Sequence, residues 1–192
     1  MQMTKKELRS LYREKRAALP EKERLRMDDL LLIRFQQLAI PYEVNILLSY
    51  WPLKQHTEVN THLMTDYLQF RMPGLQIAYP VSDFIHHSMK VLLVNDDTGF
   101  RVNQYGIAEP ADGEEIDPGE VGMVFVPLLA FDTKGYRVGY GKGFYDRFLA
   151  RCSDDIIKVG FSFFEPVAVI SDIDQFDIPL TFGVTPNQLY EF

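Results

Sequence analysis

The sequence predicts an α/β fold: a three-layer sandwich with a central sheet that is mainly parallel or mixed and helices on both faces. Apolar runs of strand length alternate along the chain with segments of helical periodicity. The first of these runs, 44–50, is compact and apolar, as in strands buried on both faces. The chain of 192 residues is long enough for one sizeable core and short for two. We therefore expect one Rossmann-like domain over residues 1–192.

The first helix is predicted over residues 4–19. Thr4 and Glu7 have the spacing of a capping box, which satisfies free backbone donors at a helix start. Apolar residues at helical spacing form one face: Leu8, Leu11, Tyr12, Ala18 and Leu19. Basic residues form a stripe on another face: Lys5, Arg9, Arg13 and Arg16. Pro20 separates this helix from a second one over 21–39.

Beyond residue 43, strand-like runs alternate with helices. The expected strands cover residues 44–50, 75–79, 89–94, 122–131 and 156–163, and the expected helices cover 60–70 and 143–151. Residues 96–120 and 132–140 are polar and rich in glycine or proline, so we expect loops there. The tail, 165–192, shows little periodicity. Sheets of this kind bind ligands at the carboxyl ends of their strands, where we expect the site.

Composition narrows the classes of partner. The net charge of −7 argues against a broad nucleic-acid surface, although a local basic cluster can still bind a small anion. The N-terminus has no signal-type apolar core, and no segment reaches about 18 apolar residues. Cys152 is the single cysteine, which excludes an intramolecular disulfide and fits a reducing compartment. We expect a cytoplasmic monomer that acts on small molecules, without a nucleic-acid or membrane partner.

Residues 137–147, which follow the most apolar run and open a helix, carry the clearest chemical signal. Glycines alternate at 139, 141 and 143, and their missing side chains let phosphate oxygens approach backbone N–H groups. Arg137 and Lys142 add positive charge. This pattern is typical of a polyphosphate-binding loop, but a flexible turn without a ligand explains the glycine spacing equally well. Neither the GxGxxG fingerprint nor the Walker A pattern is matched.

Several other polar residues have two readings. Asp146 suits a magnesium ligand beside phosphates, although from its position alone a first-turn residue favoured by the helix dipole is the better interpretation. The basic stripe suits phosphate, a plain solvated face or RNA, and no interleaved aromatics favour RNA. The adjacent His86 and His87 make a poor chelating pair and are interpreted as surface residues, and His56 and His62 are too scattered for a zinc site.

Motifs in a fixed order resemble the 5-formyltetrahydrofolate cyclo-ligase family. The most specific are VPLLAFD at 126–132, GYR at 135–137 and GYGKGFYDR at 139–147. Weaker motifs agree in order: KKELR at 5–9, EVNT at 58–61 and GIAEP at 106–110. The resemblance runs from about residue 4 to residue 185. It implies an α/β enzyme that uses ATP and Mg²⁺ to convert 5-formyltetrahydrofolate to 5,10-methenyltetrahydrofolate, with ADP and phosphate as the other products.

The resemblance also implies roles for individual residues. The ATP-binding set is Lys5, Arg9, Arg137, Val138, Gly139, Tyr140, Gly141, Lys142, Gly143, Phe144 and Tyr145. The folate-binding set is Tyr50, Trp51 and Glu58, together with Tyr140, Gly141, Lys142, Gly143 and Phe144. The catalytic set is Arg137, Lys142 and Tyr145. The metal ligands are Asp146 and Asp177.

The tail departs from the family pattern at two positions. Glu165 stands where many members have glutamine, and Thr181 where many have a second aspartate, which weakens the metal assignment of Asp177. Two other functions are weighed against the ligase. A nicotinamide-dependent oxidoreductase is disfavoured, because the glycines come late in the chain. A non-catalytic nucleotide- or folate-binding regulator of the same fold remains the alternative.

Overall fold

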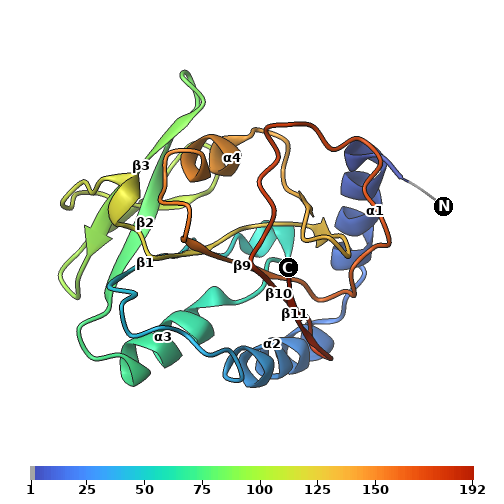
Figure 1. The fold of residues 1–192 in the computed structure, drawn as a ribbon, viewed down its shortest axis with the longest axis horizontal. Helices are drawn as coiled ribbons and strands as arrows, with labels where there is room; N and C mark the ends of the chain where they lie inside the picture. The colour runs from blue at the N-terminus through green and yellow to red at the C-terminus, as the bar shows by residue number, and fades with distance from the viewer. Residues whose placement is uncertain (1–2) are drawn as a thin grey trace.

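The computed structural model describes residues 3–192, so residues 1 and 2 of the predicted domain lie outside the described residues. A seven-stranded sheet lies between layers of helix, in the strand order β11-β10-β9-β6-β1-β2-β3 (Figure 1). Five central strands are mutually parallel: β1 (Ile46–Leu48), β2 (Gln76–Asp83), β6 (Met123–Phe125), β9 (Ile157–Phe161) and β10 (Phe182–Val184). The edge strands β3 (Ser88–Val94) and β11 (Leu189–Glu191) are antiparallel. The predicted mainly parallel, mixed sheet is therefore confirmed.

Helices cover both faces of this sheet. Helices α2 (Glu21–Phe35) and α3 (Thr61–Arg71) lie together on one face, and α4 (Phe144–Leu149) lies on the other (Figure 1). Phe35 at the end of α2 packs edge-to-face on Phe125 and Phe161 of two adjacent strands, at centroid distances of 5.6 and 5.4 Å. The core is thus two apolar layers, one on each side of the strands.

Helix α1 (Lys5–Ala17) packs against a small hairpin formed by β7 (Ala130–Phe131) and β8 (Arg137–Val138). The predicted capping box is present: the Glu7 carboxylate accepts from Thr4 N at 2.8 Å, and the Thr4 hydroxyl accepts from Glu7 N at 3.3 Å. The apolar face of α1 is buried against the hairpin through Leu8 and Tyr12. Lys5, Arg9 and Arg13 of the same helix lie along a cavity that is described below.

The order of the strands creates a switch point between β1 and β6. The chain leaves β1 for β2 on one side, and it leaves β6 for β9 and β10 on the other. The two strands pair in parallel, with Leu47 opposite Met123 and Leu48 opposite Val124. At such a point the loops after the two strands diverge and leave a crevice at their carboxyl ends.

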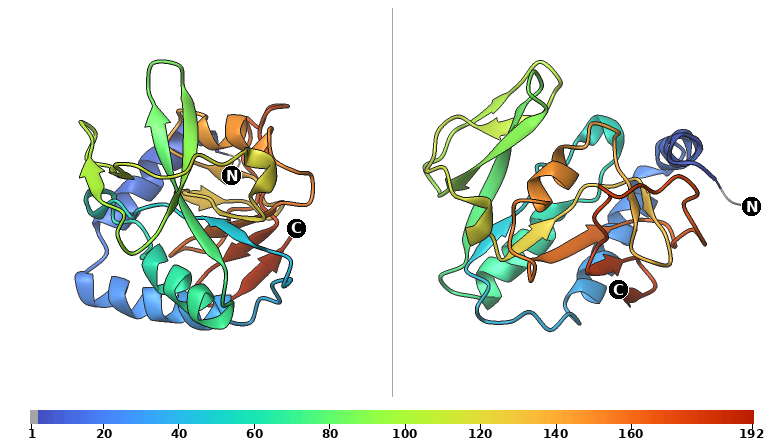
Figure 2. Two further views of the ribbon diagram at one scale, coloured as in Figure 1. Left: turned by 90° about the vertical axis from the view of Figure 1, so that its left-hand side faces the viewer. Right: turned by 45° about the horizontal axis from the view of Figure 1, so that its top comes forward.

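Several predicted boundaries are wrong. The second helix ends at Phe35 and not at residue 39, and the expected loop 132–140 contains β8. The apolar run 122–131 is not one strand: Val126 N donates to Val159 O, but Pro127 has no N–H, and the chain leaves the sheet before forming β7. The region 96–120 contains a hairpin of β4 (Phe100–Val102) and β5 (Ala108–Pro110), which stands beside the projecting β2–β3 hairpin (Figure 2). The tail supplies β10 and β11.

Two single-turn 3-10 helices, η1 (Lys54–His56) and η2 (Pro118–Glu120), complete the elements. Within residues 3–192, no helix is both long enough and apolar enough to cross a bilayer.

Candidate active site

A cavity of about 1000 Å³ opens at the carboxyl ends of β1 and β6. Its walls come from α1, the loop after β1, the β2–β3 hairpin, the glycine loop and residues 174–178. All predicted site residues but one line it: Lys5, Arg9, Tyr50, Trp51, Glu58, Arg137, Gly139, Tyr140, Gly141, Lys142, Gly143, Phe144, Tyr145, Asp146 and Asp177. The fold therefore brings together residues that the sequence separates by more than a hundred positions.

Val138 is the exception. Its side chain is fully buried among α1 and the β7–β8 hairpin, and its carbonyl accepts from Leu129 N at 2.7 Å. Strand β8 turns the Val138 side chain toward the core, while Arg137 faces the cavity, so the fold does not bring the Val138 side chain together with the other predicted ATP-binding residues.

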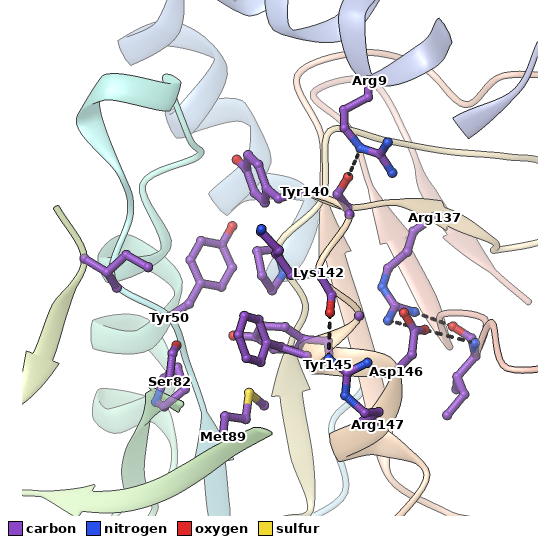
Figure 3. A pocket seen from close by; sticks show the side chains of 18 of the residues that line it. Arg9, Tyr50, Ser82, Met89, Arg137, Tyr140, Lys142, Tyr145, Asp146 and Arg147 are labelled. Atoms are coloured by element: carbon purple, nitrogen blue, oxygen red, sulfur yellow. Dashed lines mark hydrogen bonds and ion pairs between the residues drawn. The ribbon is translucent and has the colours of Figure 1, made fainter. Parts of the chain in front are cut away.

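The glycine loop links β8 to α4, and its conformation requires glycine. Gly141 and Gly143 have φ values of +90° and +67°, which other residues rarely adopt. A Cβ atom on Gly141 would lie 3.1 Å from Cζ of Arg9. Arg9 Nε also donates to Gly139 O at 2.9 Å, so α1 and the loop form one wall (Figure 3).

Arg137 and Asp146 form an ion pair in this wall. Arg137 is 9% exposed; its Nη2 donates to Asp146 Oδ1 at 2.7 Å, and its Nη1 donates to Ile178 O. Asp146 Oδ1 also accepts from Ile178 N at 3.3 Å. Burial lowers the pKa of the Arg137 guanidinium, and the nearby carboxylates of Asp146 and Asp177 oppose that shift. Arginine titrates so high that it remains a cation.

Lys5 and Asp177 form a second ion pair. Lys5 Nζ donates to the Asp177 carboxylate, and Asp174 Oδ2 lies 3.9 Å from the same nitrogen. Asp177 Oδ2 in turn accepts from Asp174 N at 2.7 Å, which holds the loop in its turn. Each predicted metal ligand is therefore paired with a cation that was predicted to contact phosphate.

The two aspartates suit a metal only together with further ligands. Among residues 3–192, no group of three or more His, Cys, Asp or Glu side chains is arranged as a metal site. Asp146 and Asp177 nevertheless line the same cavity. Magnesium is usually held by one or two carboxylates, with phosphate oxygens and water filling the other positions. The donor set fits an ion that arrives with a nucleotide.

Aromatic side chains form the other side of the cavity. The rings of Tyr50, Tyr140 and Tyr145 lie around its centre (Figure 3). Burial raises the pKa of the Tyr140 and Tyr145 phenols, so both remain neutral hydrogen-bonding groups at neutral pH. Trp51 is 36% exposed and packs between His62 and Phe100, each with a centroid distance of 4.7 Å. These surfaces suit a flat heterocycle.

Glu58 is the acidic residue on the aromatic side of the cavity. Its Oε2 accepts from Leu53 N at 2.7 Å, and its Oε1 accepts from the Tyr140 hydroxyl. Burial raises the pKa of Glu58, and these hydrogen bonds together with Arg16 and His56 oppose the rise. A carboxyl group fixed at both oxygens can present its remaining lone pairs to ring N–H groups.

The basic stripe on α1 is not a uniform solvated face. Lys5, Arg9 and Arg13 line the cavity, whereas Arg16 is buried in the protein at 2% exposure. The spacing of the charges could not show which of the four side chains is buried. Arg16 lies about one helical turn after Arg13, and at that point the rest of the protein encloses the side chain.

Other lining residues were missed. From the β2–β3 hairpin and the expected 96–120 loop come Pro80, Ser82, Phe84, Met89, Tyr105, Ile107 and Ala108. Of these, Ile107 and Ala108 lie in the GIAEP motif, and no motif marks the others. His56 also lines the cavity, with its ring 5.4 Å from that of Tyr140. His86 and His87 lie in the exposed β2–β3 turn, as predicted.

Comparison with known proteins adds independent findings. The sequence profile described as the 5-formyltetrahydrofolate cyclo-ligase family matches residues 1–180. A 5-formyltetrahydrofolate cyclo-ligase of Haemophilus influenzae is 33% identical over 117 residues, which are 59% of this chain and 61% of that protein. One from Escherichia coli K12 is 25% identical over 95% of this chain and 100% of that protein.

A match to the Mycoplasma genitalium protein of the same name spans 32% of its length, at 40% identity over 27% of this chain. The solved NMR structure of Aquifex aeolicus 5,10-methenyltetrahydrofolate synthetase superimposes with a TM-score of 0.79 at 30% identity, covering 98% of this chain and 93% of that one.

Proposed function

We propose, from the premise that this chain belongs to the 5-formyltetrahydrofolate cyclo-ligase family, that it converts 5-formyltetrahydrofolate to 5,10-methenyltetrahydrofolate at the expense of ATP. ADP and phosphate are the other products, and Mg²⁺ accompanies the nucleotide. The observation that carries the proposal is the cavity of about 1000 Å³, because one wall is cationic and the facing wall is aromatic. A triphosphate and a pteridine ring can be held there against one another.

The cationic wall suits the nucleotide. Lys5, Arg9 and Arg137 would neutralise the triphosphate, and the backbone N–H groups of the glycine loop would contact the transferred phosphoryl group. Lys142 is exposed on this loop and lines the cavity, and its ammonium would contact the terminal phosphate. Asp146 and Asp177 would hold Mg²⁺, which when bound offsets charge on the phosphate oxygens.

The aromatic wall suits the folate. Tyr50 and Trp51, at the end of β1, would pack on the pteridine ring, and the Glu58 carboxylate would accept hydrogen bonds from its N–H groups. Tyr145 lies between the two walls, at the first turn of α4, where its neutral hydroxyl would face the reacting formyl group. Tyr140 belongs to both sides, since it lies in the glycine loop and donates to Glu58.

The proposed reaction has two steps. The formyl oxygen attacks the γ-phosphorus of ATP, the bond to ADP breaks, and the formyl carbon gains a phosphate leaving group. Nitrogen N10 then attacks that carbon and loses its proton, the carbon–oxygen bond breaks, and phosphate leaves as the five-membered ring closes. The protein contributes orientation and charge neutralisation, which are the main requirements of phosphoryl transfer. No covalent protein intermediate is needed.

The direct experiment measures the near-ultraviolet absorbance of the methenyl product. Protein is mixed with 5-formyltetrahydrofolate, with and without ATP and with and without Mg²⁺. A rise that requires both is expected. Protein that binds ATP and 5-formyltetrahydrofolate but gives no rise would overturn the catalytic proposal in favour of a regulator.

Arg137→Ala tests the phosphate assignment. It should lower kcat/KM for ATP at least about tenfold, because an interaction of this kind with developing charge is worth more than about 1.4 kcal/mol. Arg26→Ala is the matched control, since Arg26 is an exposed arginine on α2. An unchanged kcat/KM in folded Arg137→Ala protein would remove Arg137 from this role.

A further inference from the structure

Arg16 is a buried cation that forms no ion pair with any carboxylate of residues 3–192. It lies in the last turn of α1 and is 2% exposed. Its Nη2 donates to Leu128 O, and its Nη1 lies 3.3 Å from the Tyr140 hydroxyl. Within the described part of the chain, its Nε has no hydrogen-bond partner. Burying a guanidinium in this way is costly, and core packing does not require a charge.

The hydrogen-bond chemistry gives the contact a direction. A guanidinium only donates, so the Tyr140 oxygen must accept from Arg16. That leaves the hydroxyl hydrogen of Tyr140 for the Glu58 carboxylate, its second partner. The three side chains therefore form one chain of donors that ends on Glu58, which faces the cavity.

We propose that Arg16 is a positioning residue of the folate site, which orients the Tyr140 hydroxyl and through it fixes the Glu58 carboxylate. The inference rests on the proposed function only insofar as Glu58 contacts the folate. Arg16 itself does not line the cavity, so it acts on the substrate through its neighbours.

The charge of Arg16 also acts on the ionisation of Glu58. Burial raises the pKa of Glu58, while the Leu53 N–H, Tyr140, Arg16 and His56 each lower it. Tyr50 and Tyr145 also face this carboxylate, and both are neutral at neutral pH. Removing the Arg16 charge leaves burial less opposed, so the pKa of Glu58 must rise. The ionised, hydrogen-bond-accepting form of Glu58 would then be lost at a higher pH.

The primary experiment follows the carboxyl carbon of Glu58 by NMR in ligand-free protein labelled with ¹³C on glutamate. The resonance is identified by its absence in Glu58→Gln. Arg16→Gln should move the titration midpoint upward by at least about half a pH unit, because nearby opposite charges typically shift carboxyl groups by about one unit or more. Arg26→Gln, which removes the same charge from the exposed surface of α2, should leave the midpoint in place. An unmoved midpoint in folded Arg16→Gln protein overturns the inference.

The kinetic readout separates positioning from stability. In Arg16→Gln the acidic limb of kcat/KM for 5-formyltetrahydrofolate should move to higher pH, while KM for ATP stays within about twofold. Arg16→Lys should return the limb toward the wild-type position, since it restores the charge. A uniform loss of activity at every pH, with the limb in place, would mean a purely structural role.

Tyr140→Phe keeps the experiment decisive if Arg16→Gln does not fold. It removes only the hydroxyl group between Arg16 and Glu58, and it leaves the bond from Arg16 to Leu128 O intact. The Glu58 midpoint should again rise, because the carboxylate loses a donor. A midpoint that does not rise contradicts the relay. The titration needs no substrate. It therefore tests the effect of Arg16 on Glu58 even if the wild-type protein does not turn over 5-formyltetrahydrofolate.

Discussion

Asp28 should make the protein less stable as the pH rises through the weakly acidic range. Its side chain is 7% exposed on α2, and Oδ1 accepts from Asn60 N, at the start of α3, at 3.0 Å. Burial, which disfavours the ionised form, raises the pKa of Asp28 to about 6, although the Asn60 bond and the charge of Arg24 oppose the rise. The unfolded chain should titrate near the ordinary value of 3.8.

The sign and size of the change in the free energy of unfolding follow from the difference in bound protons between the folded and unfolded states. The folded state binds more protons than the unfolded state between about pH 4 and pH 6, so the free energy of unfolding falls as the pH rises through that window. A shift of about two units corresponds to at most about 3 kcal/mol, and local rearrangement around the charged carboxylate reduces this to about 1–2 kcal/mol. The cost is complete above about pH 6 and absent below about pH 4.

Asp28→Asn tests this reasoning, because asparagine keeps an oxygen that can accept from Asn60 N but cannot ionise. Urea unfolding at several pH values should show the variant more stable than wild type by about 1–2 kcal/mol at pH 7.5, and nearly equal to it at pH 4. Asp97→Asn, at an exposed position in the loop after β3, is the control. A variant that is destabilised equally at both pH values would refute the argument.

Two further substitutions test packing and the site. Gly183→Ala should cost about 1–3 kcal/mol in chemical denaturation, because its Cβ would lie 2.6 Å from the buried ring of Phe131; Gly99→Ala, with nothing within 4 Å, should be nearly neutral, and equal costs would contradict the reasoning. Gly141→Ala should raise KM for ATP several-fold in steady-state kinetics, since a Cβ at φ +90° displaces Arg9; an unchanged KM would separate this contact from nucleotide binding.

The parts of the fold that follow local rules were predictable. The capping box and apolar face of α1 were confirmed, as were the order of helices and strands in the first half of the chain and the parallel sheet. The glycine loop could be placed next to the strand ends, because that order of elements puts it there. Strand β10 could not be predicted, because it has only three residues, too few for a periodic pattern, and forms by pairing with β9.

The site likewise has residues that motifs predict and contacts that only the folded chain creates. Motif residues such as Arg137 and Asp146 line the cavity, but their ion pair is a tertiary contact that no spacing rule reveals. Arg16 shows the limit most clearly. On a helix surface its spacing matches that of Arg13, yet one side chain faces the cavity and the other is enclosed by the β7–β8 region and the glycine loop. Only the position of the neighbouring segments decides between them.

The Lys5–Asp177 pair joins residues that are 172 positions apart. During synthesis, Lys5 leaves the ribosome early. It cannot pair with Asp177 until nearly all of residues 1–180, the part that matches the family profile, has been translated. Strands β1, β2 and β6 can pair before this, but the part of the cavity wall that contains the Lys5–Asp177 pair can form only after Asp177 has been synthesised. If the cavity binds ATP as proposed, nascent chains halted before residue 177 should therefore fail to retain it.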